Sequence, residues 1–198
     1  RQQDRVTSHW TGFFNPMAVM TLMIVLLLLE PDFGAVVVLL GSALGMLFLG
    51  GVRLWQFIIL IMVSAIAIAV MAVSSPYRMQ RLTAFADPWA DQFNTGYQLT
   101  QSLIAFGRGE WFGLGLGNSI QKLFYLPEAH TDFVFAILAE EWGFIGCILT
   151  LAIYAVFVGR ILFVGRCAES EGSAFSAYVA YGIALIFSAQ LFINVGVN

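Results

Sequence analysis

Five stretches of mostly apolar residues, each long enough to cross a membrane, dominate this 198-residue sequence. They fall at about 10–29, 33–52, 54–73, 133–164 and 174–197. A helix of about 20 residues spans ~30 Å of hydrocarbon and satisfies its own backbone hydrogen bonds in lipid. Because 60% of the residues are hydrophobic and only 11% are charged, a soluble globular domain is excluded. The sequence predicts an all-α fold, a polytopic transmembrane helix bundle.

The charges exclude a nucleic-acid-binding protein, since nine Lys and Arg residues against twelve Asp and Glu leave no basic surface. The spacing of the two cysteines, Cys147 and Cys167, fits neither a zinc site nor a CxxC redox pair, so two unpaired thiols are predicted. The chain begins at Arg1 without Met and stops directly after an apolar run. We therefore expect a single membrane domain that is a fragment of a longer protein.

The connection 75–132 between the third and fourth spans is too long to be a mere linker, and connections of this length usually carry function. Its apolar residues alternate with polar ones such as Gln98 and Gln101, as is typical of short helices at a membrane interface. Positive charges in short connections stay on the cytoplasmic side. Those of this chain fall on the opposite side from 75–132, at Arg1, Arg5, Arg53, Arg160 and Arg166. The connection is therefore predicted to be a large extracytoplasmic loop.

Polar groups concentrate in the stretch KLFYLPEAHTD, residues 122–132, directly before the fourth span. A carboxylate that is partly desolvated at a membrane surface has the basicity that a general base needs to accept a proton from a hydroxyl group. Asp132 is the best-placed candidate for this role. The alternative is structural: Asp132 or Thr131 caps the helix that follows, where a side-chain oxygen binds free backbone N–H groups.

Neighbouring residues offer supporting roles. Glu128 could be a second acid, or a solvated turn residue. His130 could shuttle a proton or orient Asp132, or it is an interfacial histidine bonded to backbone. Arg108 and Lys122 could stabilise a departing diphosphate by their charge, or reach toward lipid headgroups.

The helical pattern over 133–164 would be ~48 Å long, so we expect this span to tilt or to protrude at its N-terminal end. At about 100° per residue, Glu140 lies about 80° from the direction of Asp132 and Glu141 lies on the far side. Glu140 is therefore the predicted cavity residue, and the alternative is two carboxylates in a protruding polar turn. The glycines of GLGLGN at 113–118 do not follow the GxGxxG spacing, so a nucleotide site is not expected.

Residues 97–143, YQLTQSLIAFGRGEWFGLGLGNSIQKLFYLPEAHTDFVFAILAEEWG, closely resemble the SEDS family of shape, elongation, division and sporulation proteins. Within them, GNSIQKLFYLPEAHTD is most similar to the division branch of that family. The segments EPDFGAVVVLL at 30–40, SPYRMQRLTAF at 75–85 and NVG at 194–196 are similar to family segments too. The resemblance covers nearly the whole chain and implies a fragment that lacks the first spans and the last span.

This resemblance implies a multi-pass inner-membrane peptidoglycan glycosyltransferase that polymerises lipid II on the periplasmic face of the division septum. The family's essential aspartate falls on Asp132, which would act as general base in an inverting transfer. The residues expected to bind substrate are Gln98, Gln101, Arg108, Lys122, Glu128, His130, Thr131 and Glu140. A divalent cation, Mg²⁺ or Mn²⁺, could also serve at the diphosphate, and no other cofactor is expected.

The partners that the resemblance implies are lipid II and the undecaprenyl diphosphate-linked glycan, a class B penicillin-binding protein transpeptidase, and the FtsQ, FtsL and FtsB subunits. Two other functions fit the same composition. A transporter that flips lipid II would place its polar residues near the membrane midplane, whereas here they crowd one surface. A non-catalytic scaffold would tolerate the loss of Asp132.

Overall fold

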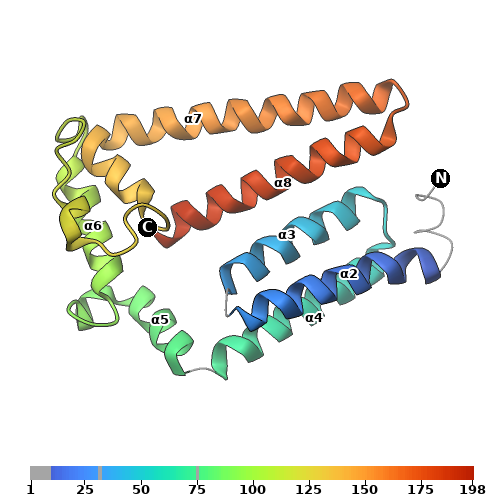
Figure 1. The fold of residues 1–198 in the computed structure, drawn as a ribbon, viewed down its shortest axis with the longest axis horizontal. Helices are drawn as coiled ribbons and strands as arrows, with labels where there is room; N and C mark the ends of the chain where they lie inside the picture. Colours follow the sequence, from blue (N-terminus) through green and yellow to red (C-terminus); the bar gives the residue numbers. More distant parts are fainter. Residues whose placement is uncertain (1–9, 31–32, 75) are drawn as a thin grey trace. The chain divides into compact units, whose positions relative to one another are not determined.

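The computed structural model describes residues 10–30, 33–74 and 76–198 (Figure 1). These residues form helices and no strand, which confirms the predicted all-α fold class. In chain order the elements are α2 (Trp10–Leu29), α3 (Phe33–Leu49), α4 (Leu54–Val73), α5 (Pro76–Ala86), η1 (Pro88–Asp91), α6 (Tyr97–Gly109), η2 (Gln121–Tyr125), α7 (Val134–Ser170) and α8 (Ala174–Val197). Arg1 and Arg5, two of the residues used to predict orientation, lie outside the described residues.

Helices α2, α4 and α8 have the bounds of the expected spans 10–29, 54–73 and 174–197. Helix α3 ends at Leu49, before the expected end at residue 52. Its end is closed by hydrogen bonds from Gly51 N–H to the Phe48 carbonyl and from Val52 N–H to the Leu47 carbonyl. This closure needs a left-handed residue, and Gly51 supplies it with a φ of 75°.

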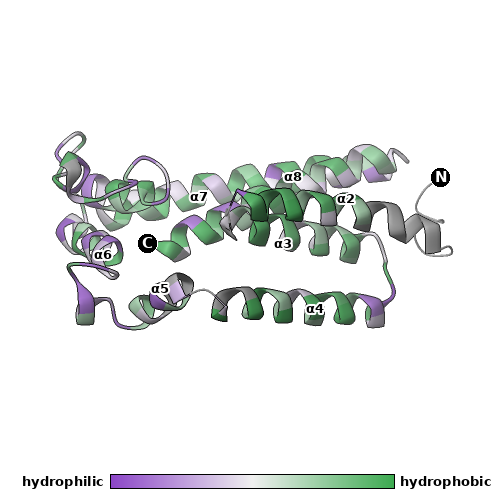
Figure 2. Ribbon diagram, turned by 60° about the horizontal axis from the view of Figure 1, so that its bottom comes forward, coloured by the Kyte–Doolittle hydropathy of each residue, from purple (hydrophilic) through white to green (hydrophobic). Residues whose placement is uncertain are grey.

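The apolar helices present large side chains outward. Among the described residues, α7 and α8 are long and apolar enough to cross a membrane, and shorter apolar helices cover Ala18–Leu29, Gly34–Leu49 and Leu54–Val70. Exposed side chains along them include Leu22, Val70 and Val156. Figure 2 shows hydrophobic residues along α3 and α4 and hydrophilic residues around α6. Apolar surface of this extent requires lipid around it, so the helices form a transmembrane bundle.

The chain divides into two compact units. The first comprises residues 1–68 and 159–190, and in it α8 buries a stripe of small residues, Ala177, Ala180 and Ala184. The second comprises residues 69–158 and 191–198 and holds the connection and the start of α7. Its core holds two clusters of buried residues. One comprises Ala105, Leu126, Ala129, Phe133 and Ala136, and the other comprises Phe135, Ala139 and Cys147.

Helix α7 is not one continuous rod. At Gly143 the backbone adopts φ 65° and ψ −167°, which divides α7 into a short helix, 134–142, and a long helix, 144–170. The bend is visible at one end of α7 in Figure 1. From the apolar pattern we expect one long span that tilts or protrudes. In the structure, the break accounts for the length of α7 in excess of the hydrocarbon thickness. The helix 144–170 alone is ~40 Å long, which suffices to cross the hydrocarbon.

Candidate functional site

The break in α7 is closed by the loop that follows α6. Four backbone hydrogen bonds join the two segments: Leu114 N–H to Glu140 O (2.9 Å), Gly115 N–H to Glu141 O (3.0 Å), Phe144 N–H to Glu110 O (2.9 Å) and Ile145 N–H to Trp111 O (3.2 Å). We call residues 110–115 and 140–145 together the junction. A helix break leaves carbonyl and amide groups without partners, and in a membrane these groups must be satisfied within the protein. The junction therefore makes the break tolerable.

The junction requires glycine on both sides. Gly113 has a φ of 77°, and a Cβ atom there would lie 2.1 Å from the Glu141 carbonyl oxygen. A Cβ atom on Gly143 would lie 2.4 Å from the Gly113 nitrogen. The glycine run at 113–118 thus contributes to a close approach of two backbones. The glycine spacing excludes a nucleotide site but does not indicate this close approach, because the segment that the run contacts lies far along the chain.

Glu140 is a fully buried acid, with no exposed side-chain surface. Its Oε2 accepts hydrogen bonds from the Ser119 hydroxyl (2.5 Å) and from Gln121 N–H (3.2 Å). Its Oε1 lies 3.6 Å from Nη1 of Arg108 and accepts no hydrogen bond from the described residues. A buried carboxylate is costly unless it is paired and hydrogen-bonded, so these partners are what keep Glu140 inside.

The next residue, Glu141, binds the only lysine of the chain. Its Oε1 lies 2.5 Å from Nζ of Lys122, and the two side chains are 13% and 27% exposed. Lys122 belongs to the short helix η2, which leads to the turn that carries Asp132. The two adjacent acids at the end of helix 134–142 therefore both hold the segment 119–122, and Glu140 also contacts Arg108.

Arg108 occupies the last turn of α6, and its side chain is 38% exposed. A cation in that position is favoured by the partial negative charge at a helix C-terminus. Of the predicted substrate-binding residues, the structure brings Arg108 and Glu140 together. Lys122 joins the same cluster through Glu141 and through its backbone N–H, which donates to the Ser119 hydroxyl (3.3 Å).

Asp132 lies in the turn directly before α7, and it is exposed. Its contacts run through its main chain: the carbonyl oxygen accepts from the side-chain amides of Asn194 (3.3 Å) and Asn198 (2.9 Å) of the α8 segment. Within the described residues, the carboxylate of Asp132 makes no hydrogen bond or ion pair. It is therefore open to a ligand.

The structure assigns the capping role to another residue. The Ala136 N–H at the start of α7 donates to Oδ1 of Asn198 (3.1 Å), while the hydroxyl of Thr131 donates to Oε2 of Glu128 (2.8 Å). The alternative in which Asp132 or Thr131 caps α7 therefore has no hydrogen bond to support it among the described residues. Asn194 and Asn198 were not among the predicted site residues, although an asparagine within an apolar span is a signal that can be read from sequence.

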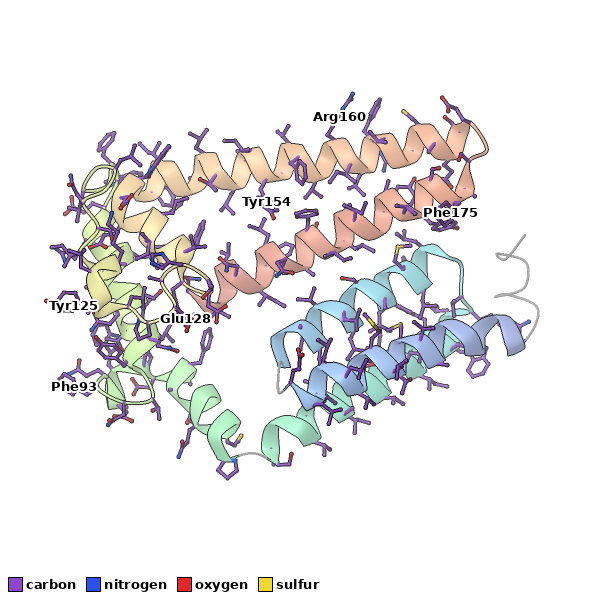
Figure 3. The ribbon with its side chains drawn as sticks, in the orientation of Figure 1. Phe93, Tyr125, Glu128, Tyr154, Arg160 and Phe175 are labelled. Carbon is purple, nitrogen blue, oxygen red and sulfur yellow. The ribbon has the colours of Figure 1, made fainter. Side chains whose placement is uncertain are left out.

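Glu128 and His130 are exposed in the same turn. Glu128 has a φ of 56°, and its carbonyl accepts the N–H groups of Thr131 (3.1 Å) and Phe133 (3.2 Å). Figure 3 labels Glu128 on this turn, and Phe93 and Tyr125 on the outside of the same unit. Glu128 thus shapes the turn with its backbone, while its side chain binds Thr131.

The other predicted residues, Gln98 and Gln101, are half-buried and lie one helical turn apart on α6. The turn before α6 is held by Asp91, whose carboxylate accepts from Nδ2 of Asn94 (2.8 Å) and from the hydroxyl (2.9 Å) and N–H (3.2 Å) of Thr95. The hydrogen bonds from the Asn94 and Thr95 side chains lower the pKa of Asp91. The described residues include no group of three His, Cys, Asp or Glu side chains that could hold a metal ion.

The short helix 134–142 thus has a functional group of a different kind near each of its ends. An open carboxylate, Asp132, precedes its first turn, and the buried acid Glu140 with its cation Arg108 lies near its last. The two acids are eight positions apart, which corresponds to roughly 12 Å along a helix axis. A carboxylate able to accept a proton and a guanidinium able to bind an anion fit a reaction that deprotonates a nucleophile and releases an anionic leaving group.

Comparisons with known proteins identify the family of this chain. The model of the cell cycle protein family FtsW/RodA/SpoVE matches residues 1–198. A probable peptidoglycan glycosyltransferase FtsW of Nitrosococcus halophilus is 60% identical over 187 residues, which are 94% of this chain and 48% of that protein. Proteins of the same name from Hahella chejuensis and Coxiella burnetii are 56% and 57% identical over the whole chain, which covers 50% and 53% of their lengths.

The fold is also found in a solved structure described as "Structural coordination of polymerization and crosslinking by a peptidoglycan synthase complex". The TM-score is 0.73 at 23% sequence identity, over 99% of this chain and 54% of that one. This chain therefore spans about half the length of the proteins that it matches. Since the family model covers every residue of it, the chain belongs to the FtsW/RodA/SpoVE family of cell cycle proteins.

Proposed function

We propose that the full protein containing this chain is an inverting peptidoglycan glycosyltransferase that polymerises lipid II at the division septum. The observation that carries the proposal is the open carboxylate of Asp132, held through its backbone beside α8. The names of relatives that are 56–60% identical support the same activity. In this proposal the protein lies in the cytoplasmic membrane of a bacterium, with residues 75–132 on the periplasmic side.

Asp132 takes the proton from the 4-hydroxyl of the acceptor's N-acetylglucosamine. The oxygen then forms a bond to the anomeric carbon of the lipid-linked donor, the bond from that carbon to the diphosphate breaks with inversion, and undecaprenyl diphosphate leaves. A diphosphate is a weak base, so it needs positive charge near it and no protonating acid. Arg108 is the better source of that charge, because it is more exposed than Lys122 and less tightly paired.

The remaining predicted residues line the path of the sugars in this proposal. Gln98, Gln101, Glu128, His130 and Thr131 would bind hydroxyl and amide groups of the substrate. No group of three His, Cys, Asp or Glu side chains that could hold a metal ion occurs among the described residues. A Mg²⁺ or Mn²⁺ ion that arrives bound to the diphosphate would need no such cluster, and polymerisation without added metal tests that part of the proposal.

The structural relative is described as a complex that coordinates polymerisation and crosslinking, and this description supports a crosslinking partner as part of the proposal. We propose a class B penicillin-binding protein in this role, with FtsQ, FtsL and FtsB as further subunits. Co-purification of the full-length protein with each candidate tests this assembly.

The decisive assay incubates the purified full-length protein and its partner with fluorescent lipid II and resolves the products on a gel. We expect a ladder of glycan strands. A lipid II transporter would instead move the substrate between leaflets of a vesicle and give no ladder, and a scaffold would do neither. Lipid II movement without polymer would contradict the proposal.

Replacing Asn194 by leucine should lower the polymerisation rate three- to tenfold, because the loss of a hydrogen bond worth about 1 kcal/mol lets the Asp132 backbone move. Asn198 still holds the same carbonyl, so the fold should persist. Gln190→Leu, one turn earlier on α8 and exposed, is the matched control and should leave the rate unchanged. Equal rates for the two variants would refute a positioning role for Asn194.

A further inference from the structure

Glu140 and Glu141 are neighbours in sequence, but they lie at different distances from the cations that they face. The Glu141 carboxylate is in direct contact with the Lys122 ammonium at 2.5 Å, so the charge of Lys122 is neutralised within the protein. The Glu140 carboxylate lies 3.6 Å from the Arg108 guanidinium without a hydrogen bond between them. Arg108 is therefore restrained by charge but keeps its hydrogen-bond donors.

Glu140 is itself firmly fixed. Its Oε2 accepts from the Ser119 hydroxyl and from the Gln121 amide, and both of those residues are buried. Because Oε2 is used in this way, Oε1 is the oxygen left for Arg108. A buried charge that lost its cation would be strongly unfavourable, so Arg108 cannot leave Glu140 without cost.

The geometry of arginine makes this pairing useful. A guanidinium carries five donors in a planar fork, and one nitrogen turned toward Glu140 leaves the other donors free. The Arg108 side chain is 38% exposed, so those donors can reach a ligand outside the protein. Forked donors suit the paired oxygens of a diphosphate.

We propose that Glu140 is a positioning residue for glycosyl transfer, which holds Arg108 by one edge so that its other edge meets the departing diphosphate. This inference rests on the proposed function and extends it. Glu140 is fully buried, so it does not contact the substrate and acts through the residues that it holds. Glu141 and Lys122 form the structural counterpart, a pair that fixes η2 without facing the substrate.

A double-mutant cycle in the full-length protein tests the proposal, with kcat and KM measured for lipid II. Glu140→Gln keeps an oxygen for Ser119 and Gln121 but removes the charge that restrains Arg108. Glu140→Gln and Arg108→Gln should each lower kcat/KM about tenfold, mostly through kcat. The double variant should also lose about tenfold, since interacting residues are not additive, whereas independent sites would lose about a hundredfold. A hundredfold loss in the double variant would overturn the proposal.

Glu141→Gln is the matched control, because it removes an acid from the same helix end. We expect it to lower the melting temperature while kcat stays within about twofold, as for a residue outside the chemistry. A loss of kcat equal to that of Glu140→Gln would also overturn the proposal, since it would show that any acid at this helix end matters equally.

If Glu140→Gln does not fold, Arg108→Lys replaces it, with inorganic diphosphate as a competitive inhibitor. Lysine keeps the charge but lacks the fork, so inhibition should weaken about tenfold. Unchanged inhibition would contradict the role of Arg108. Asp132→Asn is measured in parallel: if it polymerises normally, the proposed function itself fails, and if it is inactive while the cycle is additive, only the role of Glu140 fails.

Discussion

Replacing Asp132 by asparagine should abolish glycan polymerisation by the full-length protein while leaving it folded. Asparagine has nearly the same shape as aspartate but cannot accept the proton of the attacking hydroxyl, and loss of a general base costs about 10²- to 10⁴-fold in rate. Folding should persist because the described contacts of Asp132 run through its main-chain carbonyl, which asparagine retains. Product gels with lipid II and a thermal melt in detergent measure the two effects.

Asp91→Asn is the control for this experiment, since it changes an aspartate in the same connection whose carboxylate binds only its own turn. It should polymerise at the rate of the unchanged protein. Normal polymer from Asp132→Asn, or equal loss from both variants, would remove Asp132 from the mechanism.

The second large effect concerns the junction: Gly143→Ala should prevent the second unit from folding. Gly143 has φ 65° and ψ −167°, a conformation that is essentially restricted to glycine. An added Cβ would also lie 2.4 Å from the backbone of Gly113, which has no side chain to move aside. Backbone strain and overpacking together cost at least about 3 kcal/mol. We expect a large drop in melting temperature and in the yield of monodisperse protein.

Gly107→Ala provides the comparison. Gly107 lies in α6 with open space around its Cα, so alanine there should be neutral or stabilise the helix by up to about 1 kcal/mol. If Gly143→Ala melted at the temperature of Gly107→Ala, the break in α7 would not depend on glycine as described.

Much of the helical framework could be predicted from hydrophobic length alone, because a run of about 20 apolar residues has few alternatives to a helix in lipid. The break in α7 could not be predicted from hydrophobic length. The apolar pattern continues on both sides of Gly143, and a single glycine inside a helical pattern is usually tolerated. What breaks the helix is its contact with residues 110–115, and sequence periodicity carries no information about a partner so far along the chain.

The candidate site likewise has residues that could be predicted from the sequence and residues that could not. Asp132 could be singled out as a candidate from a dense polar stretch at the end of a span, and Glu140 from its direction on the helix. The roles of Ser119 and Gln121 could not, because they bind Glu140 only through tertiary structure. The same holds for Asn194, whose amide contacts a turn more than sixty positions earlier in the chain.

The junction also determines where this connection can change in length. Its four hydrogen bonds pair successive residues on each side, so an extra residue between Glu110 and Gly115 would shift one pair out of register with the other. Residues 116–118, which are exposed and lie outside these pairs, can absorb an insertion without disturbing the break. Natural or engineered additions to the loop are therefore confined to its tip, and the distance from the end of α6 to the start of helix 144–170 is fixed.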